Sequence, residues 1–181
     1  PAWKAMLAGV LADAGHHDEA AARLDRLVSG NLSGFPRDET GALVVRYLPE
    51  ACRQLGDGTS AAKLLPIVRN WAGQVLVVSI GTSIEGAADR SVAHLLATLG
   101  NFDSADAAYA AAAALEDSAG FPPLSARTRY WHSRLLLERG HPGDAARAAA
   151  LLGDVVDVSQ RLGMSLLTTQ AATLAATLAS R

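Results

Sequence analysis

Two short segments contain residue types that could support catalysis. The segment GDGTSAAK, residues 56–63, superficially resembles a phosphate-binding loop, in which backbone N–H groups hold phosphate oxygens. It lacks the glycine that directly precedes the lysine of such loops, and it follows a predicted helix rather than a strand. The segment GTSIEG, residues 81–86, misses the spacing of a G-x-S-x-G nucleophile elbow by one residue. We therefore expect neither a nucleotide site nor a hydrolase here.

Histidine and cysteine also fail to form a recognisable metal or nucleophile pattern. His16 and His17 are adjacent, so their side chains point to different faces, and no histidine pair has the i, i+4 spacing of a helical metal site. Solvated turn residues are the simpler interpretation. Cys52 is the sole cysteine, which excludes an internal disulfide and a thiolate cluster, and its apolar neighbours favour a small core residue. The sequence thus predicts no enzyme, no metal and no cofactor.

A binding surface is a better candidate. Arg127, Tyr130 and Arg134 have i, i+3 and i+7 spacing, which places two guanidinium groups around one ring on a shared helical face. In stacked helical hairpins the first helix of each pair usually lines the concave side, where a peptide or protein partner binds. The six candidates for such a groove are Arg46, Arg90, His94, Arg127, Tyr130 and Arg134. The alternative interpretation of the last three is a solvated basic stripe with Tyr130 packed beside it.

These side chains need helices to position them, and recurring glycines divide the chain into helices. Glycines at 15, 56, 100 and 140 each precede a polar helix start, with spacings of 41, 44 and 40 residues, as in helical solenoids. The predicted helices lie near residues 3–14, 18–29, 39–55, 59–72, 87–99, 103–119, 123–139, 144–162 and 165–179. The fold prediction is all-α: an array of about four helical hairpins and a C-terminal capping helix.

The alanine-rich stretch LGNFDSADAAYAAAAAL, residues 99–115, shows how such helices would pack. Ala105, Tyr109 and Ala112 fall on one face, where the ring fills space and the alanines admit a neighbouring helix. Pro49 and Pro66 lie inside two predicted helices and should kink or split them, since proline lacks the backbone N–H.

Two connections are longer than plain turns. Residues 29–38 contain two glycines and a proline and are predicted to form a loop. Residues 74–86, QVLVVSIGTSIEG, include a β-branched run but no alternating second strand, so we expect an apolar crossover or a helical turn rather than a sheet. An alternative function follows: a small-molecule site closed by this crossover, with an apolar pocket beside Val77 and Trp71. An open groove lined by Arg127 and Tyr130 would instead favour a peptide or protein partner.

Composition limits the function classes further. With 181 residues, half of them hydrophobic, the chain can form one compact domain, residues 1–181. A net charge of −2 argues against binding nucleic acid. The most apolar stretch, residues 164–180, is interrupted by threonines and a glutamine and is not a membrane span, and no signal peptide is recognisable. We expect a cytoplasmic module, and the initial Pro1 suggests one excised from a longer protein.

The pattern of Gly100, Phe102, Ala105 and Tyr109 resembles the tetratricopeptide repeat, although that repeat has a shorter period of about 34 residues. The whole chain resembles the C-terminal helical-repeat region of actinobacterial signalling ATPases, including LuxR-type transcriptional regulators and cyclase-ATPase fusions. The segments that carry this resemblance are AGHHDEAAARLDRLV, GFPRDE, EACRQLGD, GAADRSVAHLLATLGNFDSADAAYAAAAALE and ARTRYWHSRLLLERGHPGDAARAAALLGDVVDVSQRLGM.

This resemblance implies a sensor or arm that couples a neighbouring ATPase domain of the same chain to an output such as a cyclase or a DNA-binding domain. It supplies no catalytic residue, because the nucleotide-binding motifs of those proteins lie in segments absent from this sequence. A homodimer formed through the last helix is a further expectation.

Overall fold

The computed structural model describes residues 2–30 and 40–179, and these residues are predominantly helical. The α-helices are α1 (Ala2–Asp13), α2 (His17–Val28), α3 (Gly41–Leu55), α4 (Gly58–Val68), α5 (Ala88–Thr98), α6 (Phe102–Ser118), α7 (Pro122–Arg139), α8 (Asp144–Arg161) and α9 (Ser165–Ala179). A short 3-10 helix, η2 (Arg69–Trp71), follows α4, and two strands, β1 (Val75–Val78) and β2 (Ser83–Ala87), precede α5. The all-α class is confirmed.

Most helix ends fall within two residues of their predicted positions. Gly100 follows α5 with a φ of +76°, the left-handed conformation expected of a glycine that ends a helix. The glycines at 15, 56 and 140 have positive φ as well. The predicted loop at 29–38 falls almost wholly outside the described residues, and so does residue 39, where the third helix was expected to begin.

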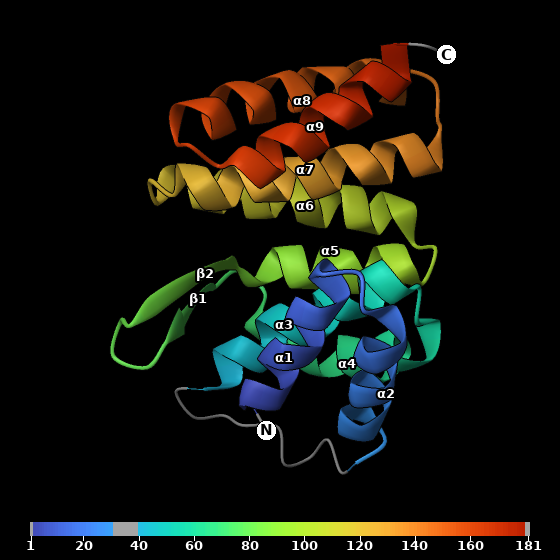
Figure 1. The fold of residues 1–181 in the computed structure, drawn as a ribbon, viewed down its shortest axis with the longest axis vertical. Coiled ribbons are helices and arrows are strands. Elements are labelled where there is room, and N and C mark those ends of the chain that lie inside the picture. The colour runs from blue at the N-terminus through green and yellow to red at the C-terminus, as the bar shows by residue number, and fades with distance from the viewer. Residues whose placement is uncertain (1, 31–39, 180–181) are drawn as a thin grey trace.

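The helices pack largely in chain order. Helix α1 lies against α2 and α3, α3 lies against α5, and each helix from α5 to α9 packs on the next. Figure 1 shows this order, with the N-terminal helices at one end of the molecule and α8 and α9 at the other. The main buried apolar cluster extends from α1 to α7, and a smaller one joins α7, α8 and α9. Ala105, Tyr109 and Ala112 are fully buried on α6, which confirms the packing face predicted for the alanine-rich stretch.

Neither proline splits its helix. Helix α3 continues through Pro49, which is buried, and α4 contains Pro66, so the expected splits are wrong. Helix α4 ends at Val68, four residues before its predicted end, and the short 3-10 helix η2 follows it.

The prediction that residues 74–86 form no sheet is wrong. Strand β1 pairs antiparallel with β2, with Val77 opposite Ile84. The second strand, SIEGA, lacks alternating apolar residues, which is why the sequence pattern did not reveal it. It is held instead by tertiary hydrogen bonds at its base, where Ala87 N donates to Glu116 Oε1.

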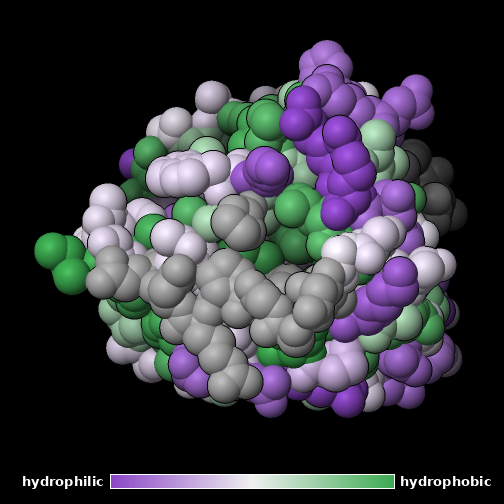
Figure 2. Space-filling view, turned by 90° about the horizontal axis from the view of Figure 1, so that it is seen from below, coloured by the Kyte–Doolittle hydropathy of each residue, from purple (hydrophilic) through white to green (hydrophobic). Residues whose placement is uncertain are grey.

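The hairpin projects from the side of the helical body (Figure 1). It exposes three apolar side chains: Val77 and Ile84 are partly exposed, and Ile80 at the turn is 94% exposed. In Figure 2 this apolar tip extends beyond the mixed polar and apolar surface of the helices. No helix in the described ranges is long and apolar enough to cross a bilayer.

Candidate functional site

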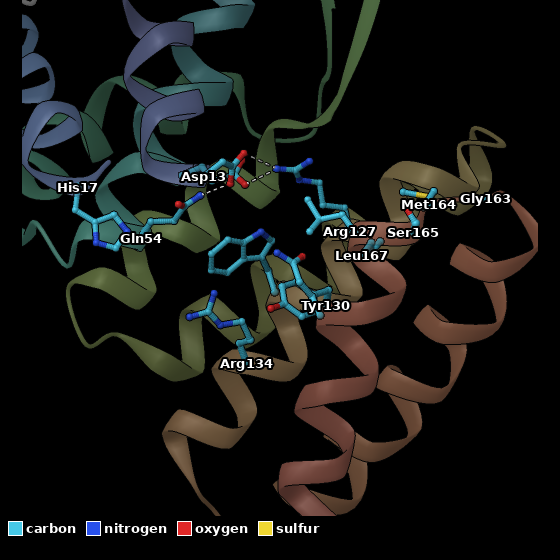
Figure 3. Close-up of a pocket in the computed structure, with 14 residues that line it drawn as sticks. Asp13, His17, Gln54, Arg127, Tyr130, Arg134, Gly163, Met164, Ser165 and Leu167 are labelled. Carbon is cyan, nitrogen blue, oxygen red and sulfur yellow. Dashed lines mark hydrogen bonds and ion pairs between the residues drawn. The ribbon is translucent and has the colours of Figure 1, made fainter. Parts of the chain in front are cut away.

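A groove lies where the N-terminal helices meet the C-terminal ones. Its volume is about 570 Å³, and its walls come from the end of α1, the start of α2, α3, α7 and the start of α9 (Figure 3). Elements more than 100 residues apart in the sequence therefore share one surface. The size is in the range of sites that hold a small ligand or a few residues of a peptide, roughly 300–1,000 Å³.

Helix α7 contributes the floor of the groove. Arg127, Tyr130 and Arg134 all line it, as their i, i+3 and i+7 spacing predicted. Trp131 lies among them, and the guanidinium carbon of Arg134 is 4.5 Å from the centre of the Trp131 ring. This is a cation–π contact, which holds the charged group over the ring. Within residues 2–30 and 40–179, the exposed Arg134 side chain forms no ion pair.

The N-terminal wall is acidic, and Arg127 reaches it from α7. Arg127 Nη2 donates to Glu50 Oε1 at 2.8 Å and to Asp13 Oδ2 at 3.2 Å (Figure 3). Asp13 also accepts a hydrogen bond from Gln54 Nε2 at 2.6 Å. Glu50 is buried and forms a second ion pair with Arg46 on its own helix. Both carboxylates of this wall are thus already paired with arginines.

The opposite wall comes from the start of α9 and combines apolar side chains with Ser165 and Gln170. Met164, Leu166 and Leu167 line it, and Leu166 is 72% exposed. The first turn of α9 contains no acidic residue. The partial positive charge of this helix N-terminus is therefore not neutralised within its own first turn.

Arg90 was expected on the groove surface, but it is only 1% exposed and lies in the interior. Its Nη1 donates to Glu116 Oε1 and to Thr128 Oγ1, each at 3.1 Å, and its Nη2 donates to the Glu85 carbonyl oxygen at 2.6 Å. Burial lowers the pKa of Arg90, and the Glu116 carboxylate opposes that shift. Arg90 thus joins the base of the hairpin to α6 and α7 and is not available to a partner in this structure.

His94 and Arg46 are likewise buried, so their predicted exposure is also wrong. His94 Nδ1 is hydrogen-bonded to Tyr109 Oη at 2.8 Å, and its ring packs edge-on against Trp131 with centroids 4.9 Å apart. Burial, reinforced by nearby arginines, holds the pKa of His94 well below its usual value. This neutral histidine supports the groove floor from behind.

The sequence analysis missed several groove residues. Asp13, Glu50 and Gln54 lie on α1 and α3, and nothing in their local pattern indicates that they face α7. Trp131 adjoins Tyr130, but neighbouring positions on a helix point about 100° apart, so a single-face argument does not include both. Leu166 is exposed at the start of α9, and nothing in the local sequence there indicates that it lines a groove. Long-range packing alone brings these residues together.

The remaining candidates for chemistry have ordinary environments. Cys52 is fully buried, and burial raises the pKa of its thiol, which keeps it protonated. His16 and His17 are exposed. The described residues contain no cluster of three or more potential metal ligands. Val77 is partly exposed on the projecting hairpin, and Trp71 packs against the main core.

Comparisons of the chain with protein-family models, with curated proteins and with solved structures find no match. The geometry of the groove is therefore the main basis for a functional assignment.

Proposed function

We propose that this chain is a non-catalytic helical-repeat module that binds a segment of a protein or peptide partner in the groove. The observation that carries the proposal is the convergence of Arg127, Tyr130 and Arg134 on one groove that also exposes Leu166 on its opposite wall. Polar anchors beside exposed apolar side chains are typical of surfaces that recognise peptides. No arrangement of a nucleophile with a base accompanies them among the described groove residues.

The architecture that would present this groove is a tetratricopeptide-like array. Helices that pack on their neighbours in chain order, separated by glycine turns at intervals of 40 to 44 residues, support this proposal. The resemblance to the helical-repeat region of LuxR-type regulators and cyclase-ATPase fusions supports a regulatory role. In that role the module would act in the cytoplasm and transmit partner binding to a neighbouring ATPase domain.

Arg127 provides a route for such coupling. It extends from α7 to Asp13 at the end of α1 and to Glu50 on α3. Arg127 thus links a C-terminal helix of the groove to two N-terminal ones. A partner bound between these helices would compete with these ion pairs or reinforce them. Either effect changes the preferred orientation of the C-terminal helices relative to the N-terminal ones.

A peptide-display selection tests the binding proposal. The probe is a library of random heptapeptides selected on the immobilised chain, and the affinity of enriched peptides is then measured for the Arg127→Ala/Arg134→Ala variant. We expect affinity to fall by at least about tenfold, because both groups are anchors at the centre of the groove. Arg129→Ala, on another face of α7, is the matched control and should leave the affinity unchanged. Enriched peptides that bind the double variant as well as the original chain would refute the proposal.

The coupling proposal needs the parent protein with its ATPase domain. An enriched peptide added at saturating concentration should change the rate of ATP hydrolysis in that protein, and the double variant should not respond. An unchanged rate with bound peptide would show that the module binds a partner without acting on an ATPase.

A further inference from the structure

We infer that the groove selects acidic segments: a carboxylate side chain of the partner binds Arg134, and an apolar side chain of the same segment packs against Met164 and Leu166. This inference rests on the proposed function and adds the chemical class of the partner. It follows from the charges of the groove, from the position of the Arg134 guanidinium and from the exposed apolar wall.

The charges of the groove leave one cation without a partner. Glu50 pairs with Arg46 behind the groove and with Arg127, and Asp13 pairs with Arg127, while Arg134 lines the same groove. Arg46 and Arg127 are engaged with the two carboxylates, whereas Arg134 forms no ion pair with any residue that the structure describes. Neither groove carboxylate therefore neutralises the cation at Arg134, and a bound anion would do so.

The position of Arg134 suits a carboxylate in particular. Its guanidinium lies over Trp131, a ring that is itself buried and held by His94 from behind. A guanidinium held over a ring by a cation–π contact still has N–H groups that can form two parallel hydrogen bonds with a carboxylate. Stacking also limits the motion of the side chain before binding, which reduces the entropy lost when the ion pair forms.

The apolar wall defines what accompanies the carboxylate. Leu166 is 72% exposed and lines the same groove as Arg134, together with Met164. A leucine or aromatic side chain of the partner would remove this surface from water, at about 25 cal/mol per Å² of apolar area buried. A basic segment could use the same apolar wall, but its charge would be repelled by Arg134. The expected partner is thus both acidic and apolar.

The test uses two heptapeptide display libraries of equal apolar content, one with Asp and Glu at its charged positions and one with Lys and Arg. Binding is measured on a Trp3→Phe/Trp71→Phe background, in which the fluorescence of Trp131 reports on the groove. We expect the acidic library to supply the binders. Arg134→Gln should weaken them by at least about tenfold, and added salt should weaken them as well. Arg134→Lys should restore only part of the affinity, because an ammonium lacks the planar fork.

The other outcomes distinguish a failure of this inference from a failure of the proposed function. Binders from the basic library, or acidic binders that ignore Arg134→Gln while depending on Arg127 and Tyr130, would overturn the inference and leave the proposed function standing. Failure of both libraries to supply groove-dependent binders would overturn the proposed function itself. Arg129→Gln, which removes a cation from α7 outside the groove, separates a local effect of Arg134 from a general effect of charge.

Discussion

Arg90 and Arg134 are two arginines that were predicted to line the same surface and that lie in contrasting environments. Both lie on helices predicted to line one concave surface. Arg90 is enclosed by Glu116, Thr128 and the Glu85 carbonyl, whereas Arg134 lies exposed over Trp131. The first joins the hairpin to the helical body, and the second remains available to a ligand. The comparison shows that the function of an arginine depends on which acceptors surround it, and helical spacing does not supply that information.

Arg90 and Arg134 should also differ in their contribution to the free energy of unfolding. A buried charge has lost its hydration, so removing its partner leaves a desolvated charge without compensation. An exposed cation keeps its hydration, and its removal changes little. Four predictions test this contrast, from the largest expected effect to the smallest.

The largest effect is expected from separating Arg90 and Glu116. Glu116→Gln leaves the guanidinium buried without its carboxylate and should lower the free energy of unfolding by about 3–5 kcal/mol. Urea denaturation followed by circular dichroism measures this change. The double variant Arg90→Leu/Glu116→Leu should recover part of the loss, because no charge is then left unpaired. A loss below about 1 kcal/mol in Glu116→Gln would mean that water reaches this pair.

The second-largest loss of stability is expected at Gly86, where the backbone of the hairpin lies close to the Arg90–Glu116 pair. Gly86 has a φ of +99°, and a Cβ there would lie 2.6 Å from Glu116 Oε1 and 2.8 Å from Arg90 Nη2. Gly86→Ala should therefore cost more than the roughly 1–3 kcal/mol of backbone strain alone. Gly81→Ala is the matched control, since Gly81 has a φ of +93° but no atom within 4 Å of an added Cβ. Equal losses in the two variants would show that the buried pair can move aside.

The third prediction concerns pH and His94. Its pKa is lowered by burial and by the positive charges of neighbouring arginines, so the unfolded chain binds a proton more readily than the folded one. Stability should thus fall as pH decreases below about 6.5, by up to about 1.4 kcal/mol per pH unit for one proton. His94→Gln should reduce this slope in urea titrations between about pH 7 and pH 5.

Burial also lowers the pKa of His132, although Asp106 opposes that shift, so a smaller slope should persist in His94→Gln. A slope unchanged by His94→Gln would mean that folding does not lower the pKa of His94.

The smallest effect on stability is expected at Arg134. Arg134→Gln removes an exposed cation–π contact, which is worth at most about 1 kcal/mol. Its unfolding midpoint in urea should therefore stay close to that of the original chain, even though peptide binding is weakened. A large loss of stability would place Arg134 in the same class as Arg90 and remove the contrast between them.

The helical elements could be predicted because their signals are local. Gly100 ends α5 where its sequence position indicated, and the burial of Tyr109 between Ala105 and Ala112 follows from i, i+4 and i+7 spacing alone. The hairpin could not be predicted in the same way. Its second strand has unfavourable composition and depends on Glu116, which lies 29 residues away from Ala87 in the sequence.

The groove was predicted only in part, for the same reason. Spacing along one helix placed Arg127, Tyr130 and Arg134 on one face, and the structure brings all three into the groove. Spacing could not show that Asp13 and Glu50 would lie opposite Arg127, because their separation along the chain is 114 and 77 residues. It also could not separate Arg90 from Arg134, since burial depends on what packs over a helix.

The sequence by itself determined where the helices begin and end and which side chains share a helical face, because backbone conformation and side-chain direction depend on near neighbours. Only the tertiary structure decided which of those faces are covered, how the hairpin is held and which charges meet across the groove. These outcomes depend on desolvation and on contacts between distant segments, and both are properties of the assembled fold.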